Sequence, residues 1–241
     1  MTELRRVLIV DVETGGLDPQ ADPVIEVAGV LLDVEHGEVI GAASLLQGAP
    51  INRAEHVNQI PSSLLRSLPG SMSRAPRRDA TDPAFQPLFG LIGLADAFVA
   101  HRATFDRKFF PESIARLLPW ICSKFSCDWP RGRYGDHLVD LALAHGVAVT
   151  ANHRALDDCM LLARIMRRVR RDYGWPNGQG NALRDVLRGG LERGVGEPPR
   201  CRHGLERGNQ CRNYLRTYIR DENSFGSKNC ADHGGSAQWV S

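Results

Sequence analysis

The sequence predicts an α/β protein built on a mixed five-stranded sheet flanked by helices, and two patterns carry this prediction. The chain begins with strand patterns joined by a short turn, which is typical of an antiparallel meander. After residue 82, helical and strand patterns alternate, which is typical of strands joined through helices. A sheet that contains both kinds of connection is mixed.

The first strand is an apolar run at residues 7–10 that leads into an acidic stretch with two glycines, DVETGGLD, at residues 11–18. Side chains two apart on a strand point to the same face, so we expect Asp11 and Glu13 to point the same way. Two such carboxylates raise each other's pKa unless a cation lies between them. Mg²⁺ and Mn²⁺ prefer these oxygen ligands. The pattern indicates a divalent metal site, and its alternative is a solvated strand end that is acidic.

The next elements follow from apolar periodicity and from turn residues. Residues 24–33 and 37–47 form a predicted hairpin across the turn at His36 and Gly37. Residues 48–82 are rich in Pro, Ser and Arg, which predicts a loop region with one short helix near 62–65. Further along, the pattern predicts a helix from residue 82, a strand at 97–101, a helix capped by Thr104, a strand at 120–125, a helix at 136–145 ended by Gly146, and a long helix from Asn152 or His153 to about 173.

The apolar pattern loosens after residue 174, which predicts one domain at residues 1–173, a linker at 174–199 and a small module at 200–241. Net charge is −5 over residues 1–163, +9 over 164–220 and −2 over the last 21 residues. An acidic half followed by an arginine-rich segment suits a polyanionic partner such as nucleic acid. Arginine usage driven by a GC-rich genome is the alternative.

Apolar runs fall short of the roughly 20 residues that cross a bilayer. The six residues before the first strand leave no room for a signal peptide. We therefore expect a cytoplasmic protein that does not enter a membrane.

Two more acids lie where a metal site would need them. Asp106 is one turn inside the helix that follows the strand ending at His101. Asp158 lies five residues after His153, an offset of roughly 140° on a helix of 3.6 residues per turn. We expect His153 and Asp158 to frame one cleft without touching each other.

Three segments, 11–16 (DVETGG), 99–106 (VAHRATFD) and 153–158 (HRALDD), resemble in order and spacing the three motifs of the DEDDh, or DnaQ-like, 3′–5′ exonucleases. The resemblance covers about residues 5–172. The spacing of His153 and Asp158 is similar to that of the histidine subclass, and it selects Asp158 rather than Asp157 as the metal acid. Asp157 is expected to be an exposed helix residue.

The resemblance implies a ribonuclease H-like fold and a phosphodiester hydrolase with two Mg²⁺ or Mn²⁺ ions. Asp11, Glu13 and Asp158 would bind the first ion, Asp11 would also reach the second, and Asp106 would complete the site directly or through water. Two such ions roughly 3.5–4 Å apart stabilise the attacking and leaving oxygens. Histidine titrates near neutral pH, so His153 can take a proton from the attacking water.

The resemblance also implies substrate contacts. The backbone N–H groups of Thr14 and Gly15 would approach the 3′-terminal nucleotide. Relatives carry Asn where this chain has Arg102, and because arginine accepts no hydrogen bond, this departure puts substrate preference in doubt. Phe105 and Phe109 are expected in the core, with base stacking by Phe105 as the alternative.

The last segment carries Cys201, Cys211, Cys230 and His233 among six arginines and two tyrosines. So short a module needs a staple, and zinc is the expected one in a reducing compartment. His203 is a competing ligand, and a disordered tail with free cysteines is the alternative. Arginine with tyrosine suits single-stranded nucleic acid, and docking to a polymerase or repair complex fits nearly as well. Cys122, Cys127 and Cys159 are expected as buried thiols.

Together these features predict a metal-dependent 3′–5′ exonuclease that acts on single-stranded DNA. The same carboxylates would also cleave RNA, so 3′-end trimming of RNA is an alternative. A nucleic-acid-binding or tethering subunit whose catalysis is vestigial is the alternative from another class of function.

Overall fold

The structure is a computed structural model, and it describes residues 3–69, 82–131, 137–149, 153–173 and 180–195, together with the strand backbone at 228–230 and 235–237. By contacts the chain divides into two compact units, Met1–Gly196 and Glu197–Ser241. The domain boundaries expected at residues 173 and 199 stay a prediction.

A five-stranded sheet in the order β3-β2-β1-β4-β5 forms the centre of the first unit. β1 pairs antiparallel with β2, and β2 with β3, while β4 runs parallel to β1 and β5 parallel to β4. The mixed five-stranded sheet expected from the sequence is thereby confirmed. Its strands are β1 (Arg6–Thr14), β2 (Val24–Asp33), β3 (Glu38–Leu46), β4 (Ala97–Ala100) and β5 (Trp120–Cys122).

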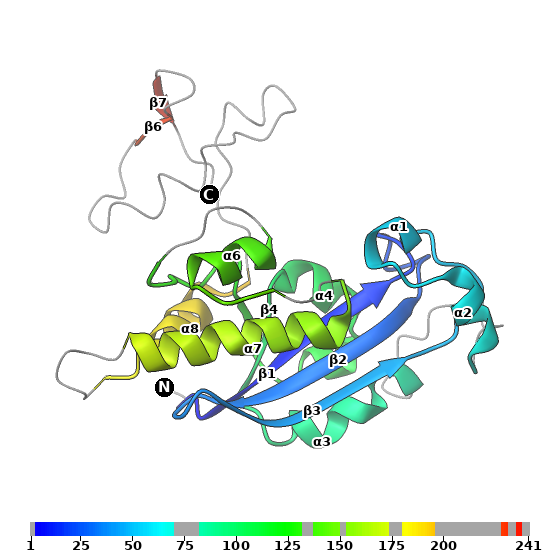
Figure 1. The fold of residues 1–241 in the computed structure, drawn as a ribbon, viewed down its shortest axis with the longest axis horizontal. Helices are drawn as coiled ribbons and strands as arrows, with labels where there is room; N and C mark the ends of the chain where they lie inside the picture. Colours follow the sequence, from blue (N-terminus) through cyan, green and yellow to red (C-terminus); the bar gives the residue numbers. More distant parts are fainter. Residues whose placement is uncertain are drawn as a thin grey trace. The chain divides into compact units, whose positions relative to one another are not determined.

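Helices cover both faces of this sheet, and α7 crosses one face over β1 and β2 (Figure 1). Among the described helices, none is long and apolar enough to cross a membrane. The helices are α1 (Glu55–Asn58), α2 (Ser62–Ser67), the 3₁₀ helix η1 (Pro83–Leu88), α3 (Phe89–Ile92), α4 (Ala103–Phe109), α5 (Glu112–Ala115), α6 (Leu138–Ala144), α7 (Ala155–Asp172) and α8 (Ala182–Arg193).

Alternation along β1 sends its side chains into two separate cores. Val7 and Ile9 pack with the buried faces of α6, α7 and α8. Leu8 and Val10 point the other way and pack with residues of η1, α4 and α5. Since successive strand residues face opposite sides, the odd-numbered positions Asp11 and Glu13 lie on the face that α7 covers.

Two helix starts differ from the prediction. α4 begins at Ala103 with Arg102 as its N-cap, so Thr104 lies inside the helix and does not cap it. Ala103 is fully buried, and its packing favours a helix that begins at Ala103, one residue before Thr104. α7 begins at Ala155 with Arg154 as its N-cap.

His153 therefore lies before α7, in a left-handed conformation with φ 62°. The predicted helical offset between His153 and Asp158 does not apply. β5 also ends earlier than expected, at Cys122, because the chain turns there and the N–H of Ser126 donates to the Cys122 carbonyl over 2.8 Å. Gly146 ends α6 as predicted, with φ 65°.

α8 forms inside the segment 174–199 that was expected to be a linker. Asn181 caps it, since its side chain accepts from the N–H of Arg184 and donates to the Val34 carbonyl. Leu183 and Leu187 are fully buried in the core beneath α7. The cap and the spacing of these two leucines are the sequence signals that identify this helix.

The second unit is described only at two short strands. β6 (Lys228–Cys230) and β7 (Gly235–Ala237) pair antiparallel, with Asn229 opposite Ser236. The side chains of the expected zinc ligands lie outside the described residues.

Candidate metal and active site

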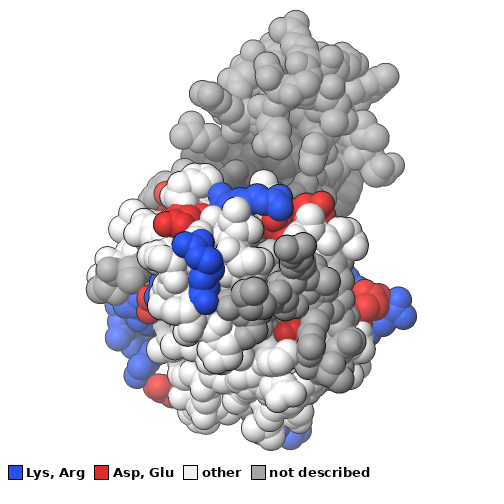
Figure 2. Space-filling view, turned by 90° about the vertical axis from the view of Figure 1, so that its right-hand side faces the viewer, with Lys and Arg blue, Asp and Glu red and all other residues white. Residues whose placement is uncertain are grey.

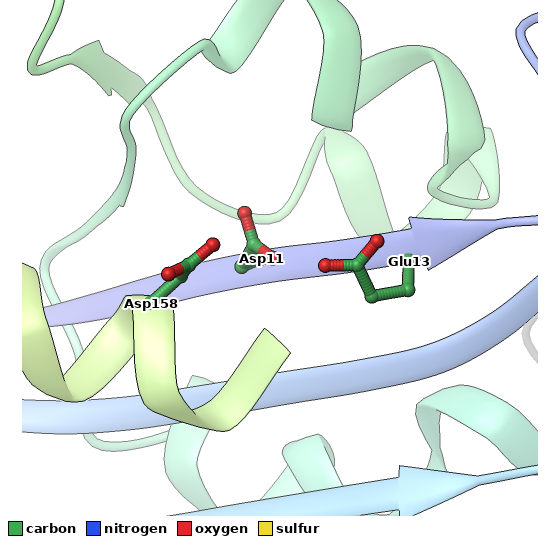
Figure 3. Close-up of side chains that lie close together, drawn as sticks. All are labelled: Asp11, Glu13 and Asp158. Carbon is green, nitrogen blue, oxygen red and sulfur yellow. The ribbon is translucent and has the colours of Figure 1, made fainter. Parts of the chain in front are cut away.

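Three carboxylates from two distant parts of the chain converge on one face of the sheet. Asp11 and Glu13 project from β1, and Asp158 projects from the first turns of α7, with their side chains directed toward one another (Figure 3). One oxygen of each carboxylate lies within 4.8 Å of the others. Each of the three side chains is half-buried. The sequence prediction that these acids share a site is consistent with this geometry.

The approach of α7 to the sheet explains how Asp158 reaches β1. Ala28 is the cross-strand partner of Asp11, and both Ala28 and Ala155 are fully buried. Cys159 of α7 faces the sheet, and its Sγ lies 3.8 Å from the Ala28 carbonyl. Small side chains at this contact let the helix approach the sheet closely, and Asp158, the residue before Cys159, thereby lies beside Asp11.

Asp106 lies next to the group of three. It is 3% exposed and lies at the end of the first turn of α4. Burial raises its pKa to about 7, against hydrogen bonds from its own N–H and from the N–H of Val12, and against the nearby charge of Arg102. Its charge in turn raises the pKa of Asp11. Asp106 is therefore an electrostatic neighbour of the site.

The acids make the site strongly unfavourable for negative charge. Burial, followed by repulsion from Asp106, Glu13 and Asp158, raises the pKa of Asp11 well above its usual range. Burial and then the charge of Asp158 raise the pKa of Glu13 to about 8. Burial also raises the pKa of Asp158. Several hard oxygen donors that repel one another fit a divalent cation such as Mg²⁺ or Mn²⁺, which would remove this penalty.

His153 acts electrostatically on Asp158. The charge of the histidine and its backbone N–H both favour the ionised form of the Asp158 carboxylate, against the effect of burial on its pKa. A non-glycine residue at φ 62° costs about 1–3 kcal/mol, and such conformations persist only where the surroundings impose them. His153 is partly exposed, so its side chain is accessible to solvent.

The turn after Glu13 is closely packed. Thr14 is 5% exposed, and its hydroxyl donates to the Gly16 carbonyl over 2.6 Å. The N–H of Gly15 donates to the Pro23 carbonyl over 2.8 Å, so the substrate contact expected from this N–H is not available in the structure. A Cβ on Gly15 would lie 3.0 Å from the ring of Pro23. The two glycines therefore serve the close packing of this turn.

The other predicted substrate residues flank Asp106 on α4. Arg102 is exposed at the start of the helix. Phe105 is partly exposed and its ring packs at 5.0 Å from that of Phe109, which is 6% exposed and lies in the core. The structure thus confirms the core position of Phe109 and leaves part of Phe105 accessible.

Sequence reasoning missed one ion pair beside the site. Glu26 is 4% exposed and accepts from both the Nε and the Nη2 of Arg154, each over 2.9 Å. It also accepts from the N–H of Ala155 over 3.3 Å. The available signal was an acid within a strand that is otherwise apolar from residue 24 to 32.

The remaining predictions concern Asp157 and the cysteines, some of which lie within the described residues and some outside them. Asp157 is exposed, as expected. The thiols of Cys122, Cys127 and Cys159 are buried, also as expected. Cys201, Cys211 and His233 lie outside the described residues, as does the side chain of Cys230.

Comparison with known proteins gives a fold rather than a family. No protein-family profile matches this sequence. No curated protein sequence matches it either.

Solved structures match the first unit. The zinc-bound form of the E. coli ExoI–ssDNA complex aligns over 70% of this chain and 41% of that chain, with 16% identity and a TM-score of 0.53. Cell-death related nuclease 4 (CRN-4) aligns over 69% of this chain and 64% of that chain, with 18% identity and a TM-score of 0.51. Exonuclease X in complex with 5′ overhanging duplex DNA aligns over 74% and 99%, with 23% identity and a TM-score of 0.47.

The likeness to ExoI and CRN-4 establishes that this chain has an exonuclease-like fold of the ribonuclease H-like kind, as expected. The matched region spans less than two thirds of each of these two chains.

Proposed function

We propose that this protein is a metal-dependent 3′–5′ exonuclease of the DEDDh type that removes nucleotides from the 3′ end of single-stranded DNA. The observation that carries the proposal is the convergence of Asp11, Glu13 and Asp158 within 4.8 Å on one face of the sheet. The exonuclease-like fold supports it, because the acids lie on the first strand and on a helix that crosses it.

Asp11, Glu13 and Asp158 would hold two Mg²⁺ or Mn²⁺ ions, with Asp106 completing the set directly or through water. Ions bound there would supply stabilisation of negative charge on the attacking and leaving oxygens of the phosphate. The half-buried carboxylates exclude part of the solvent, which strengthens every electrostatic interaction at the site.

His153 would act as general base. It takes a proton from a water molecule as the water oxygen forms a bond to phosphorus. The bond from phosphorus to the 3′ oxygen of the preceding nucleotide breaks, and that oxygen is protonated as it leaves. The products are a nucleoside 5′-monophosphate and a strand one nucleotide shorter.

Single-stranded DNA is the proposed substrate because the ExoI structure with this fold holds that ligand. On the face seen from the side of α1 and α2, basic and acidic side chains lie beside one another on the described surface (Figure 2). We therefore assign recognition of the reacting phosphate to the acidic cluster with its cations. Thr14, Arg102 and Phe105 would contact the terminal nucleotide and its neighbour.

Digestion of 5′-labelled oligonucleotides tests the proposal. DNA and RNA strands of one sequence are incubated with the protein and Mg²⁺, alongside an Asp11→Ala variant. A ladder shortened from the 3′ end, lost in the variant and faster on DNA, is the expected result. Faster digestion of RNA would replace DNA with RNA as substrate. Tight binding without turnover in Mg²⁺ or Mn²⁺ would refute the enzyme and favour a tethering subunit.

For the C-terminal module we propose one structural zinc held by Cys201, Cys211, Cys230 and His233, and docking to nucleic acid or to a polymerase or repair complex. Four such ligands are the usual set for structural zinc. Elemental analysis of the purified full-length protein should give one zinc per chain, and a Cys211→Ser/Cys230→Ser variant should give none. Zinc retained in that variant would refute the assignment.

A further inference from the structure

Glu26 on β2 and Arg154, the N-cap residue of α7, form an ion pair at the N-terminus of that helix. Arg154 directly follows His153 in the chain. Glu26 is 4% exposed and is the cross-strand partner of Glu13. A carboxylate so buried and so close to other acids is costly unless it is paired. Arg154 pairs it with two parallel hydrogen bonds, each of 2.9 Å.

This arrangement fixes the backbone as well as the charges. Glu26 also accepts from the N–H of Ala155, the first residue of α7, and the Arg154 carbonyl accepts from the N–H of Asp158 over 3.0 Å. One buried carboxylate thus binds the side chain of the N-cap residue and the backbone of the residue after it. The start of α7, which carries Asp158, cannot shift without breaking these bonds.

The residue held next to this anchor is His153, at φ 62°. Its left-handed conformation is unfavourable for a non-glycine residue, so something must impose it. The bidentate pair with Glu26 fixes Arg154, the residue that follows the histidine, and the bond from the N–H of Asp158 to the Arg154 carbonyl ties that residue to α7.

We propose that Glu26 and Arg154 form a positioning clamp that holds His153 in its strained conformation beside Asp158, and so acts on the reaction through the histidine. The inference rests on the proposed function. The two residues are positioning residues, since the contacts described here are to each other and to the backbone. Outer contacts of this kind are worth about 10–100-fold in activity or metal affinity.

The variants are chosen so that the fold survives. Arg154→Ala is avoided, because it would leave a buried carboxylate unpaired, which is strongly destabilising. A Glu26→Gln/Arg154→Gln double variant removes both charges together and leaves no unpaired ion. Arg154→Lys keeps the charge but loses the bidentate geometry. Arg167→Ala is the matched control, because Arg167 also joins α7 to the sheet, through an exposed 2.9 Å pair with Glu38.

The first measurement needs no activity. Histidine-selective NMR of the metal-free protein identifies the His153 resonance by its loss in His153→Ala. The double variant and Arg154→Lys should shift or broaden that resonance, and Arg167→Ala should leave it in place. An unchanged His153 resonance in folded clamp variants would overturn the proposal, whatever the activity.

The second measurement asks whether the clamp acts through the histidine. On a labelled single-stranded DNA, the double variant and Arg154→Lys should each lose about 10–100-fold in kcat, with KM and Mn²⁺ affinity by calorimetry within about threefold of wild type. In a His153→Ala background, the same changes should lower kcat no further. If the clamp changes and His153→Ala lower kcat independently, so that their effects multiply, the clamp does not act through the histidine. The same conclusion follows if the clamp variants change only KM, which would indicate direct contact of Arg154 with the substrate. Either result would overturn the proposal. Inert wild-type protein with intact NMR effects would refute the nuclease and not the clamp's geometry.

Discussion

Glu13 and Glu26 are cross-strand partners on β1 and β2, so two carboxylates project from directly opposite positions on one face of the sheet. Like charges at such positions are destabilising. Arg154 binds Glu26, whereas the pKa of Glu13 is raised to about 8 by burial and by its acidic neighbours. Glu26 therefore has a counter-ion within the protein, whereas a bound cation would be needed to stabilise the ionised form of Glu13.

The first prediction concerns the stability of the metal-free protein. The pKa of Glu13 rises from 4.5 to about 8 and that of Asp106 from 3.8 to about 7 on folding. Between these limits the folded protein keeps protons that the unfolded chain has released, so the free energy of unfolding falls as pH rises. The stabilisation is complete below about pH 4 and is lost as pH rises through 7 to 8.

Thermal unfolding in EDTA from pH 5 to pH 8 measures this effect. The Tm of wild type should fall more steeply with pH than that of Glu13→Gln, whose side chain does not titrate. Adding Mn²⁺ should raise the Tm of wild type more at pH 8 than at pH 6, because the metal competes with protons for the same oxygens. Equal slopes for wild type and variant would contradict the shifted pKa.

The second prediction uses two adjacent acids on α7. Asp158→Asn should lower kcat/KM about 10²–10³-fold, as the loss of one preorganised charge does. It should also stabilise the metal-free protein, because burial raises the pKa of Asp158 and the amide carries no charge to bury. Asp157→Asn is the control, since Asp157 is exposed. Digestion rates and Tm of the two variants check this, and equal activity losses would contradict it.

Much of this site follows from the sequence because strand periodicity is local. Asp11 and Glu13 share a face since they are two apart on a strand, and that inference needs no tertiary structure. The spacing of His153 and Asp158, through its resemblance to the histidine subclass, also predicted Asp158 rather than Asp157 as the metal acid. The five strands followed in the same way from apolar patterns and turns.

The missed features depend on contacts between distant segments. The pairing of Glu26 with Arg154 joins residues 128 positions apart, and no local pattern encodes it. The left-handed φ of His153 is likewise imposed by its surroundings, so helical periodicity placed the start of α7 too early. α8 was missed because the segment is rich in glycine and arginine and contains only a short row of buried apolar residues.

The third prediction concerns the turn after Glu13. A Cβ on Gly16 would lie 2.2 Å from Oδ2 of Asp22, and Asp22 is 5% exposed and accepts from the N–H of Asp18. Gly16→Ala should therefore cost about 1–3 kcal/mol through overpacking and lower kcat/KM by moving Thr14. Gly90→Ala is the control, as nothing lies within 4 Å of its added Cβ. Unfolding and digestion assays on both variants decide, and a neutral Gly16→Ala would contradict the packing.

The fourth prediction separates packing from base stacking at Phe105. Its ring packs on Phe109 at 5.0 Å, so Phe105→Leu should lower the free energy of unfolding by about 1 kcal/mol and leave KM within about twofold. Base stacking contributes about 1–3 kcal/mol per base, which would instead appear as a KM raised about fivefold or more. Tm and KM on a labelled single strand distinguish the two roles.

The last prediction concerns Arg102, at the position where the motif resemblance leads us to expect Asn. It is the N-cap residue of α4, and its side chain makes no capping hydrogen bond. Asn is among the best N-cap residues, so Arg102→Asn should raise the free energy of unfolding by about 0.5–1 kcal/mol.

The same change removes a positive charge beside Asp106. If Arg102 contacts one phosphate of a bound strand, its loss should weaken binding at low salt and reduce the slope of log K against log salt by about 0.7. Binding of single-stranded DNA in Ca²⁺ across a salt series measures this, with Arg107→Asn, an exposed residue of the same helix, as the control. An unchanged slope together with a raised Tm would mean that Arg102 weakens its helix without contacting the substrate backbone, and the assignment of a phosphate contact would then be wrong.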